Sequence, residues 1–263
     1  MRYLIRLSFD GSAFCGWQIQ NNAPSIQECL QKVLSTLLNE EVTVTGAGRT
    51  DSKVNAINYV AHFDTAAEVR FESEEMRYKL NAILPHGITV HEVSETGKDF
   101  HARFDAKKRE YTYFLHRNKD PFMDGFSYLY TFPLDREKMN LGAEKLIGTH
   151  DFSCFEKIGG GNKTSICTVF SAEWSEYTPS HISLMGYPGN DGDYLMFRIS
   201  ADRFLRNMVR AVVGTLLEIG RGKHEPEWIR DIMDKGNRSD AGESVPGKAL
   251  FLSGIRYSDI DFF

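Results

Sequence analysis

The sequence predicts an α+β fold in which helices pack on one face of a largely antiparallel sheet. Two observations lead to this prediction. The first half of the chain reads strand, helix, strand, strand, helix, strand, so hairpin connections alternate with strand–helix–strand units. The second half follows the same order more loosely, although no sequence repeat relates the two. We therefore expect two similar halves, residues 1–100 and 101–263.

The first half opens with a strand over 2–9, where apolar and polar residues alternate. Ser25 and Glu28 form a capping box, which predicts the start of a helix. The apolar residues that follow recur at helical spacing and would form one buried face: Ile26, Leu30, Val33, Leu34, Leu37 and Leu38. A second helix is expected near 73–82, and it leads into a strand near 88–94.

In the second half, strands are expected over three segments: 108–116, 166–176 and 181–200. Asp135 suits the N-cap of a helix that runs to about Ile147. A longer helix is expected over 202–219, ending at Gly220 because glycine favours helix termini. The glycine-rich stretch 159–162 is interpreted as a hairpin tip, since no Gly-Lys-Ser/Thr sequence follows that would bind phosphate.

The composition is typical of a soluble intracellular protein. The chain has 263 residues, of which 41% are hydrophobic, and no segment approaches about 20 uninterrupted apolar residues. The N-terminus alternates like a strand and lacks the apolar core of a signal peptide. Four cysteines lack the spacing of a zinc site and are interpreted as reduced thiols: Cys15, Cys29, Cys154 and Cys167. We therefore expect no membrane segment, disulfide or metal.

The charge pattern argues against a protein that coats nucleic acid indiscriminately, because the formal net charge is -5 at pH 7. Local basic surfaces are still compatible with this charge. Three clusters supply them: Lys107, Lys108 and Arg109; Arg203, Arg206 and Arg210; and Arg221, Lys223 and His224. Taken singly, each cluster is better explained as a solvated face.

The segment Gly46–Asp51, with the sequence GAGRTD, is the strongest candidate for chemistry. Strands are expected over 42–46 and 54–63, so Asp51 should lie on the connection between two neighbouring strands. An acid at the end of a glycine-loosened turn, close behind Arg49, suits a reactive carboxylate. The alternative is an ordinary turn, in which Gly-x-Gly is also common.

Six further motifs accompany GRTD along the chain: FDGSAFCGWQIQ (9–20), PSIQECL (24–30), FHARFDAKKREYTYFL (100–115), GTHDFSCF (148–155), FLRNMVRAVVGTLLEIGRGK (204–223) and PGKALFL (246–252). In this order they resemble the motifs of the tRNA pseudouridine synthases of the TruA family. The resemblance extends from about residue 2 to residue 257. Ordered motifs over nearly the whole chain are far more specific than a single tetrapeptide.

This resemblance implies two ferredoxin-like (RNP-like) halves that share a central, largely antiparallel sheet. It also implies a cytoplasmic, homodimeric isomerase that converts uridine to pseudouridine at positions 38–40, in the anticodon arm of tRNA. The reaction moves a glycosidic bond without redox change, so no cofactor is expected. Two alternatives stay open: a non-catalytic tRNA-binding or RNA-folding protein, and an unrelated hydrolase that uses GAGRTD to hold a sugar or nucleotide.

The resemblance also assigns roles to individual residues. Asp51 aligns with the catalytic aspartate of the family, and Tyr111 with an active-site tyrosine on which a flipped uracil can stack. Arg210 is the candidate counter-ion that would keep the carboxylate ionised. Leu250 resembles a residue that lines the base pocket, and Arg49 can reach the RNA backbone.

The remaining basic residues are expected to bind RNA. On the helix expected over 202–219, Arg203, Arg206 and Arg210 are spaced three and four apart and would share one face, where the first two can hold phosphates. Three more candidates precede the tyrosine strand: Lys107, Lys108 and Arg109.

The chain departs from the family next to the proposed catalytic acid. The family commonly continues GRTD as AGVHA, whereas this chain reads SKVNA, so Lys53 replaces a glycine and Asn55 a histidine. Cys167 stands where the family usually has arginine, and Ala249 replaces a glycine. Because the catalytic set is intact, we expect the changes beside Asp51 to alter which uridines are reached, not whether reaction occurs.

Overall fold

The computed structural model describes residues 1–66, 71–157, 159, 164–258 and 261–262. The chain divides into two compact units, which we describe separately. Met1–Arg109 together with Phe251–Phe263 forms unit 1, and Glu110–Leu250 forms unit 2. This division differs from the expected boundary at residue 100. The C-terminal segment returns to the first unit because its strand pairs with a strand of that unit, Phe251 opposite Asn55.

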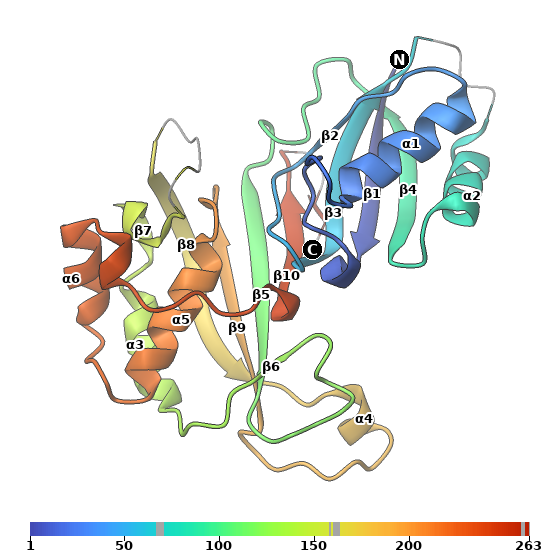
Figure 1. Ribbon diagram of the computed structural model, residues 1–263. Coiled ribbons are helices and arrows are strands. Elements are labelled where there is room, and N and C mark those ends of the chain that lie inside the picture. The colour runs from blue at the N-terminus through green and yellow to red at the C-terminus, as the bar shows by residue number, and fades with distance from the viewer. Residues whose placement is uncertain (67–70, 158, 160–163, 259–260, 263) are drawn as a thin grey trace. The chain divides into compact units, whose positions relative to one another are not determined.

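Unit 1 contains a sheet whose strands follow the order β4-β1-β3-β10 (Figure 1). The strands are β1 (Arg2–Phe9), β2 (Val44–Gly46), β3 (Asn55–Asp64), β4 (Ile88–Thr96), β10 (Leu250–Arg256) and β11 (Asp261–Phe262). β1 pairs antiparallel with β3 and β4, and β2 pairs antiparallel with β3, whereas β10 lies parallel to β3. The predicted, largely antiparallel sheet is confirmed for this unit.

The helices of unit 1 are α1 (Ile26–Leu38) and α2 (Ser73–Ile83), with a short 3-10 helix, η1 (Gly11–Ala13), after β1. α1 and α2 lie side by side on one face of the sheet (Figure 1). The capping prediction is confirmed, because Ser25 Oγ accepts a hydrogen bond from Glu28 N at 3.3 Å. Asn39 ends α1 in the left-handed conformation, with φ of 54°.

Unit 2 contains a sheet with the strand order β5-β9-β8-β7. Its strands are β5 (Lys108–His116), β6 (Tyr128–Leu129), β7 (Gly148–Asp151), β8 (Ile166–Glu176) and β9 (Tyr194–Ala201). β8 pairs antiparallel with β7 and with β9, and the short β6 lies parallel to β5. β5 has the bounds that the sequence predicts, and its first two residues belong to unit 1.

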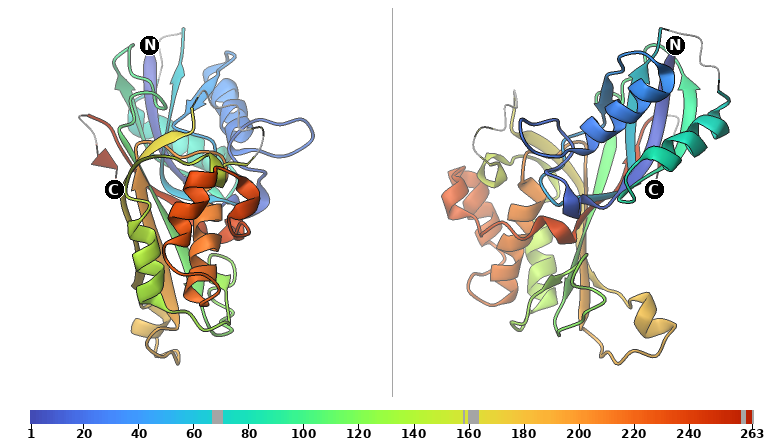
Figure 2. Two further views of the ribbon diagram at one scale, coloured as in Figure 1. Left: turned by 90° about the vertical axis from the view of Figure 1, so that its left-hand side faces the viewer. Right: turned by 45° about the vertical axis from the view of Figure 1, so that its right-hand side comes forward.

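The helices of unit 2 are α3 (Arg136–Glu144), α4 (Ser180–Ser183), α5 (Met208–Gly220) and α6 (Trp228–Lys235), with 3-10 helices η2 (Ser153–Phe155), η3 (Arg238–Asp240) and η4 (Gly247–Ala249). α3 packs against α5 and against β8 (Figure 2). Gly214 of α5 lies so close to the Glu243 carbonyl that a Cβ there would collide with it. None of the helices in the described residues is long and apolar enough to span a membrane.

The helix expected over 202–219 begins only at Met208, so that prediction is wrong at its start. The carboxylate of Asp202 accepts a hydrogen bond from Thr168 N on β8 at 2.8 Å, which holds the segment outside a helix. Asn207 then adopts φ of 66° immediately before α5. A polar bond to a distant strand therefore overrides the local helical pattern.

The strand expected over 181–200 begins only at Tyr194. α4 and a turn occupy the residues before it, and in this turn Asn190 N donates to the Asp193 carboxylate at 2.8 Å. The turn residues of this segment, glycine, asparagine and aspartate, favour local hydrogen bonds over a strand ladder.

Two smaller differences complete the comparison with the sequence. Asp135 is the N-cap of α3, as predicted, and accepts from Lys138 N at 3.0 Å, but the helix ends at Glu144, before Ile147. The sequence did not predict α6 or β10. Apart from its first residue, the glycine-rich stretch 159–162 lies outside the described residues.

Candidate active site

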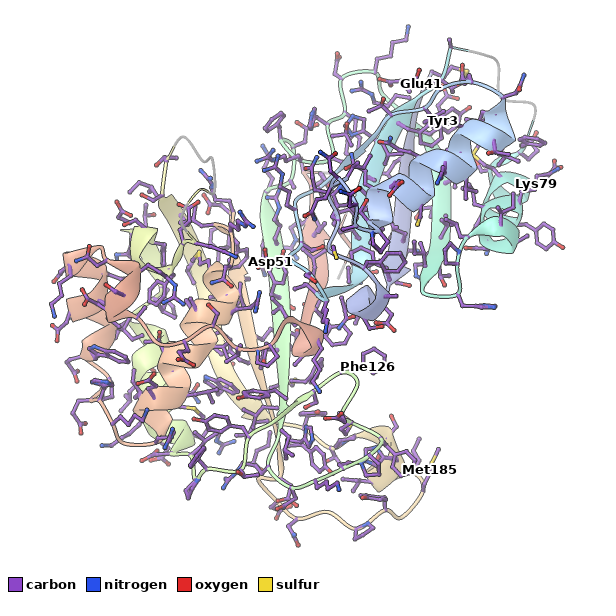
Figure 3. All side chains as sticks on the ribbon, in the orientation of Figure 1. Tyr3, Glu41, Asp51, Lys79, Phe126 and Met185 are labelled. Atoms are coloured by element: carbon purple, nitrogen blue, oxygen red, sulfur yellow. The ribbon has the colours of Figure 1, made fainter. Side chains whose placement is uncertain are left out.

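Asp51 lies on the connection between β2 and β3, as the sequence predicts (Figure 3). Ala47 N donates to Val60 O at 2.8 Å, so the loop leaves the sheet as a continuation of the hairpin. Val54 N donates to the Asp51 carbonyl at 3.2 Å and closes a tight turn on the other side. The half-exposed carboxylate is therefore carried on a short loop that is fixed at both ends.

Two glycines near the N-terminus let the chain pack directly under this loop. A Cβ on Gly11 would collide with the Val54 carbonyl, and a Cβ on Gly16, whose φ is 92°, would collide with the Thr50 carbonyl. Trp17 N donates to that same Thr50 carbonyl at 3.3 Å. These glycines were not among the predicted site residues, although both lie in the motif that follows β1.

An aromatic pair supports the loop from the sheet side. The ring of Tyr59, on β3, stacks on Trp17 with centroids 4.2 Å apart. The Tyr59 hydroxyl donates to the Gly48 carbonyl and receives a bond from Gly48 N at 3.4 Å. The absence of a side chain at Gly46 leaves room for both rings. The backbone before Asp51 is thus held by an aromatic side chain that sequence reasoning did not identify.

The two departures beside Asp51 have different structural roles. Asn55 is 2% exposed, and its Oδ1 accepts a hydrogen bond from Gly11 N at 2.8 Å. Its side chain therefore supports the loop from inside the protein and offers no surface to a substrate. Lys53 is exposed, and its φ of 64° lies in the left-handed region that favours glycine, the residue expected there from the resemblance.

Among the basic candidates of unit 1, Arg49 and Lys107 are exposed and Lys108 is half-buried. Arg49 Nε donates to Gln18 Oε1 at 2.8 Å, an exposed hydrogen bond between the loop and the segment that precedes α1. Lys107 N donates to Arg256 O at 2.8 Å, so the backbone before β5 is tied to the end of β10.

Arg109 has a different environment from the two lysines before it. Its Nη2 donates to Ala47 O at 2.9 Å and to Arg103 O at 2.6 Å, and its Nη1 donates to Ala106 O at 3.4 Å. The guanidinium is half-buried and joins three backbone carbonyls of unit 1. One of these carbonyls belongs to the loop that carries Asp51.

In unit 2, Tyr111 is 9% exposed, and its ring meets Phe204 edge-on with centroids 5.1 Å apart. Tyr113, two residues along β5, is fully buried and donates its hydroxyl to Pro246 O at 3.1 Å. Burial raises the pKa of Tyr113 far above its ordinary value. Tyr113 is thus a core residue, and Phe204 is an additional ring beside Tyr111 that the sequence did not single out.

Arg210 lies on the first turn of α5 and is half-buried. Its Nε donates to Val245 O at 2.7 Å, while Val245 N donates to the Arg210 carbonyl at 3.2 Å. This reciprocal pair fixes the guanidinium against the segment that leads into Leu250, which is 4% exposed.

Arg203 and Arg206 do not lie on α5, so the expectation that they share a helix face with Arg210 is wrong. Arg203 N donates to the Asp202 carboxylate at 2.7 Å, and the Arg206 carbonyl accepts from Lys157 N at 3.0 Å. Arg206 is exposed and Arg203 is half-buried. They occupy the irregular segment before the helix.

The candidate residues therefore form two sets, one in each unit. Arg49 and Lys53 flank Asp51 on the unit 1 loop, and Tyr111 and Arg210 belong to unit 2. A half-exposed carboxylate on a fixed loop is suited to act as a nucleophile or a base.

Comparison with known proteins gives the following matches. A family model described as tRNA pseudouridine synthase matches residues 7–105 and 143–258. A protein of Bacteroides fragilis, named tRNA pseudouridine synthase A, is 45% identical over 97% of this chain and 96% of its own length. A protein of the same name from Porphyromonas gingivalis is 40% identical over 97% of each chain. The solved archaeal box H/ACA sRNP Nop10-Cbf5 complex has a chain with 14% identity and a TM-score of 0.32, covering 93% of this chain and 58% of its own, a likeness too weak to support an argument.

Two of the three proposed catalytic residues lie inside the family match. Asp51 and Arg210 fall within the matched ranges, as does Leu250. Tyr111 lies in the interval between the two ranges and so outside the family match.

Proposed function

This chain belongs to the tRNA pseudouridine synthase family, and from this membership we propose that it converts uridine to pseudouridine in tRNA. The reaction breaks the bond between uracil N1 and ribose C1′, turns the base, and joins C5 to C1′. The proton that leaves C5 is balanced by the proton that N1 gains. Because substrate and product are isomers, no cofactor enters the proposed reaction.

We assign the central role to Asp51. The observation that carries this assignment is a half-exposed carboxylate on a loop that close glycine contacts and Tyr59 hold in place. A carboxylate fixed before the substrate arrives can attack an electrophilic carbon or remove a proton without a further ordering step.

We also assign roles in the reaction to three residues of unit 2. Tyr111 presents a ring, oriented by Phe204, on which an unstacked uracil can lie. Arg210 supplies positive charge from a guanidinium that is fixed by its bond to Val245 O. Leu250 supplies an apolar wall for the base.

We propose that the basic residues bind the tRNA backbone, since phosphate contacts give affinity without reading the base sequence. The proposed contacts are Arg49, Lys107, Lys108, Arg203 and Arg206. Because such contacts release counterions, the Kd for tRNA should rise steeply with salt concentration.

The finer features of the proposal follow from the resemblance of the motifs. We propose that the modified uridines are those at positions 38–40 of the anticodon arm, that the protein acts as a homodimer, and that it works in the cytoplasm. Mapping of pseudouridine in tRNA from cells with and without this gene tests the positions.

The central test uses tRNA that carries tritium at C5 of its uridines, because pseudouridine formation releases that hydrogen. Wild-type protein should release tritium, and Asp51→Asn should lower the rate at least about a hundredfold. tRNA binding should stay within about tenfold, since the substitution changes little surface. Free uracil among the products would identify a hydrolase instead. Tight tRNA binding without tritium release would identify a non-catalytic RNA-binding protein.

A further inference from the structure

The turn formed by residues 100–105 of unit 1 is closed by its own hydrogen bonds. His101 N donates to the Asp105 carboxylate at 2.7 Å, and Asp105 N donates to the His101 carbonyl at 3.1 Å. His101 Nδ1 accepts from Arg103 N at 3.2 Å and from Phe104 N at 3.3 Å. These four short-range bonds lie within one turn, so its backbone has little freedom.

The same turn is anchored to the interior of unit 1. Ala102 is fully buried, and its N–H donates to His62 Nδ1 at 3.1 Å. Its carbonyl accepts from the Tyr257 hydroxyl at 2.6 Å. The N–H of Ala102 is thus bonded to a side chain of β3, and its carbonyl to the side chain that directly follows β10. These two bonds fix the turn on the sheet.

The rigid turn holds an aromatic ring in solvent. Phe104 is 72% exposed, and the ring of His101 lies beside it with centroids 4.3 Å apart. The guanidinium of Arg103, itself exposed, lies over the Phe104 ring, 5.6 Å from its centroid. A single exposed apolar side chain is common on proteins. This one differs because its backbone is fixed, the His101 ring lies against it, and a cation lies over it.

Arg109 connects this turn to the loop that carries Asp51. One nitrogen, Nη2, donates to the carbonyl of Arg103 in the turn and to the carbonyl of Ala47 in the loop. The turn and the loop therefore share a single guanidinium, and the planar group allows little relative movement of the two carbonyls.

We propose that Phe104 is a stacking platform for a base of the tRNA, and that Arg109 is the positioning residue that sets this platform relative to Asp51. The inference rests on the proposed function and adds to it a recognition surface within unit 1. Aromatic rings that bind RNA take up a base of any identity on their face. The exposed cations Arg103 and Lys107 fit an anionic partner better than an apolar protein surface.

The first experiment compares three variants at Phe104 with a matched control. Tyr78, on α2 of the same unit, is also 72% exposed, so Tyr78→Ala removes an equal exposed ring at another place. Phe104→Ala should raise KM and Kd for tRNA about tenfold, as expected for the loss of one base stack. Phe104→Trp should keep KM and Kd near the wild-type values, because it retains a ring. Phe104→Leu should raise both, as Phe104→Ala does, whereas Tyr78→Ala should leave both unchanged. Thermal unfolding should be unchanged throughout, because the side chain is exposed.

The second experiment tests the positioning role through non-additivity. Arg109→Lys should raise KM because an ammonium has no second nitrogen for the Ala106 carbonyl and no plane that fixes the direction of its bonds to the other two carbonyls. In the Phe104→Ala background the same substitution should change KM by less than about twofold, since the platform that it positions is already gone. Independent, multiplying effects on KM would show that Arg109 does not act through Phe104.

The outcomes separate this inference from the proposed function. If wild-type protein forms pseudouridine and Phe104→Ala keeps KM and Kd within about twofold, the platform is overturned while the proposed function stands. If Phe104→Leu binds tRNA as well as wild type, the contact is an apolar one and not a base stack. A change in sedimentation on Phe104→Ala, with unchanged tRNA binding, would assign the ring to a contact between copies of this chain and overturn the proposal. If wild type forms no pseudouridine, the proposed function fails, and the Kd series still decides whether Phe104 binds tRNA.

Discussion

The two segments that carry the proposed catalytic groups are held in different ways. In unit 1, the Asp51 loop has close backbone packing at Gly11 and Gly16, where there is no room for a Cβ, in addition to its hydrogen bonds to side chains. In unit 2, the segment before α5 is held by polar side chains, with Asp202 bonded to Thr168 N and Asn207 Nδ2 bonded to Ser244 Oγ at 2.6 Å. The first arrangement should fail when atoms are added, and the second when a hydrogen-bonding atom is removed.

Each segment also contains one residue in the left-handed conformation. Lys53 has φ of 64° two residues after Asp51, and Asn207 has φ of 66° three residues before Arg210. Asparagine tolerates this conformation better than lysine does, and its amide also binds Ser244 here. The same backbone shape is therefore supported by residue type in unit 2 and imposed by the surroundings in unit 1.

Among the tests of this comparison, Arg210→Lys should have the largest effect on the reaction rate, because it removes a polar anchor of unit 2 while keeping the charge. The guanidinium donates to Val245 O through Nε and can donate in a second direction from the same plane, which an ammonium on a flexible chain cannot reproduce. We expect kcat to fall at least about tenfold, or about 1.4 kcal/mol, in tritium-release assays at saturating tRNA. Kinetics equal to wild type would mean that charge alone suffices at this position.

Close packing in unit 1 is tested by Gly11→Ala against Gly48→Ala. A Cβ at Gly11 would collide with the Val54 carbonyl and lie 2.9 Å from the Lys53 carbonyl carbon, whereas a Cβ at Gly48 meets nothing within 4 Å. We expect the first substitution to lower the free energy of unfolding by about 2 kcal/mol and the second by less than about 1 kcal/mol. Both are measured by urea denaturation. Equal losses would show that the loop adjusts to the added carbon.

These contrasts explain how much of the fold and the site could be read from the sequence. Strand alternation and helix caps are local signals, so the bounds of β5 and the start of α1 follow from neighbouring residues alone. The start of α5 could not be predicted, because Asp202 is bonded to a strand residue 34 positions earlier. The hydrogen bonds of Arg109 could not be predicted for the same reason, since its partner Ala47 lies 62 positions away.

A buried histidine, His62, is one of the polar anchors of unit 1, and its titration gives a pH test of the comparison. Burial, followed by the charges of Arg2 and His101, lowers the pKa of His62 to about 4 from 6.5, against the opposing charges of Asp64 and Asp105. Since Nδ1 accepts from Ala102 N, the folded protein favours the neutral ring. The unfolded chain therefore binds a proton below pH 6.5 that the folded protein does not bind until about pH 4.

Stability should accordingly be fully present above pH 6.5 and fall as the pH drops towards 4. Between pH 7 and 5 the contribution of His62 amounts to about 2 kcal/mol. His62→Asn, whose side-chain oxygen can still accept from Ala102 N, should remove that part of the pH dependence of unfolding. If the free energy of unfolding of His62→Asn falls between pH 7 and 5 by as much as that of wild type, the acid sensitivity belongs to other groups. The Asn207–Ser244 bond of unit 2 contains no group that titrates in this range.

The smallest expected effect is at Lys53, where strain and charge can be separated by two substitutions. Lys53→Gly removes both the ammonium and the Cβ that disfavours φ of 64°, whereas Lys53→Ala removes only the ammonium. Relief of the left-handed strain is partly offset by the greater freedom of glycine in the unfolded chain. We expect Lys53→Gly to be more stable than Lys53→Ala by up to about 1 kcal/mol, while both weaken tRNA binding equally if the ammonium contacts phosphate. At Asn207 the glycine substitution should instead destabilise, because it removes the bond to Ser244. If the glycine substitution stabilises the protein at both positions, backbone strain outweighs the side-chain bond in both segments, and the proposed difference between them is wrong.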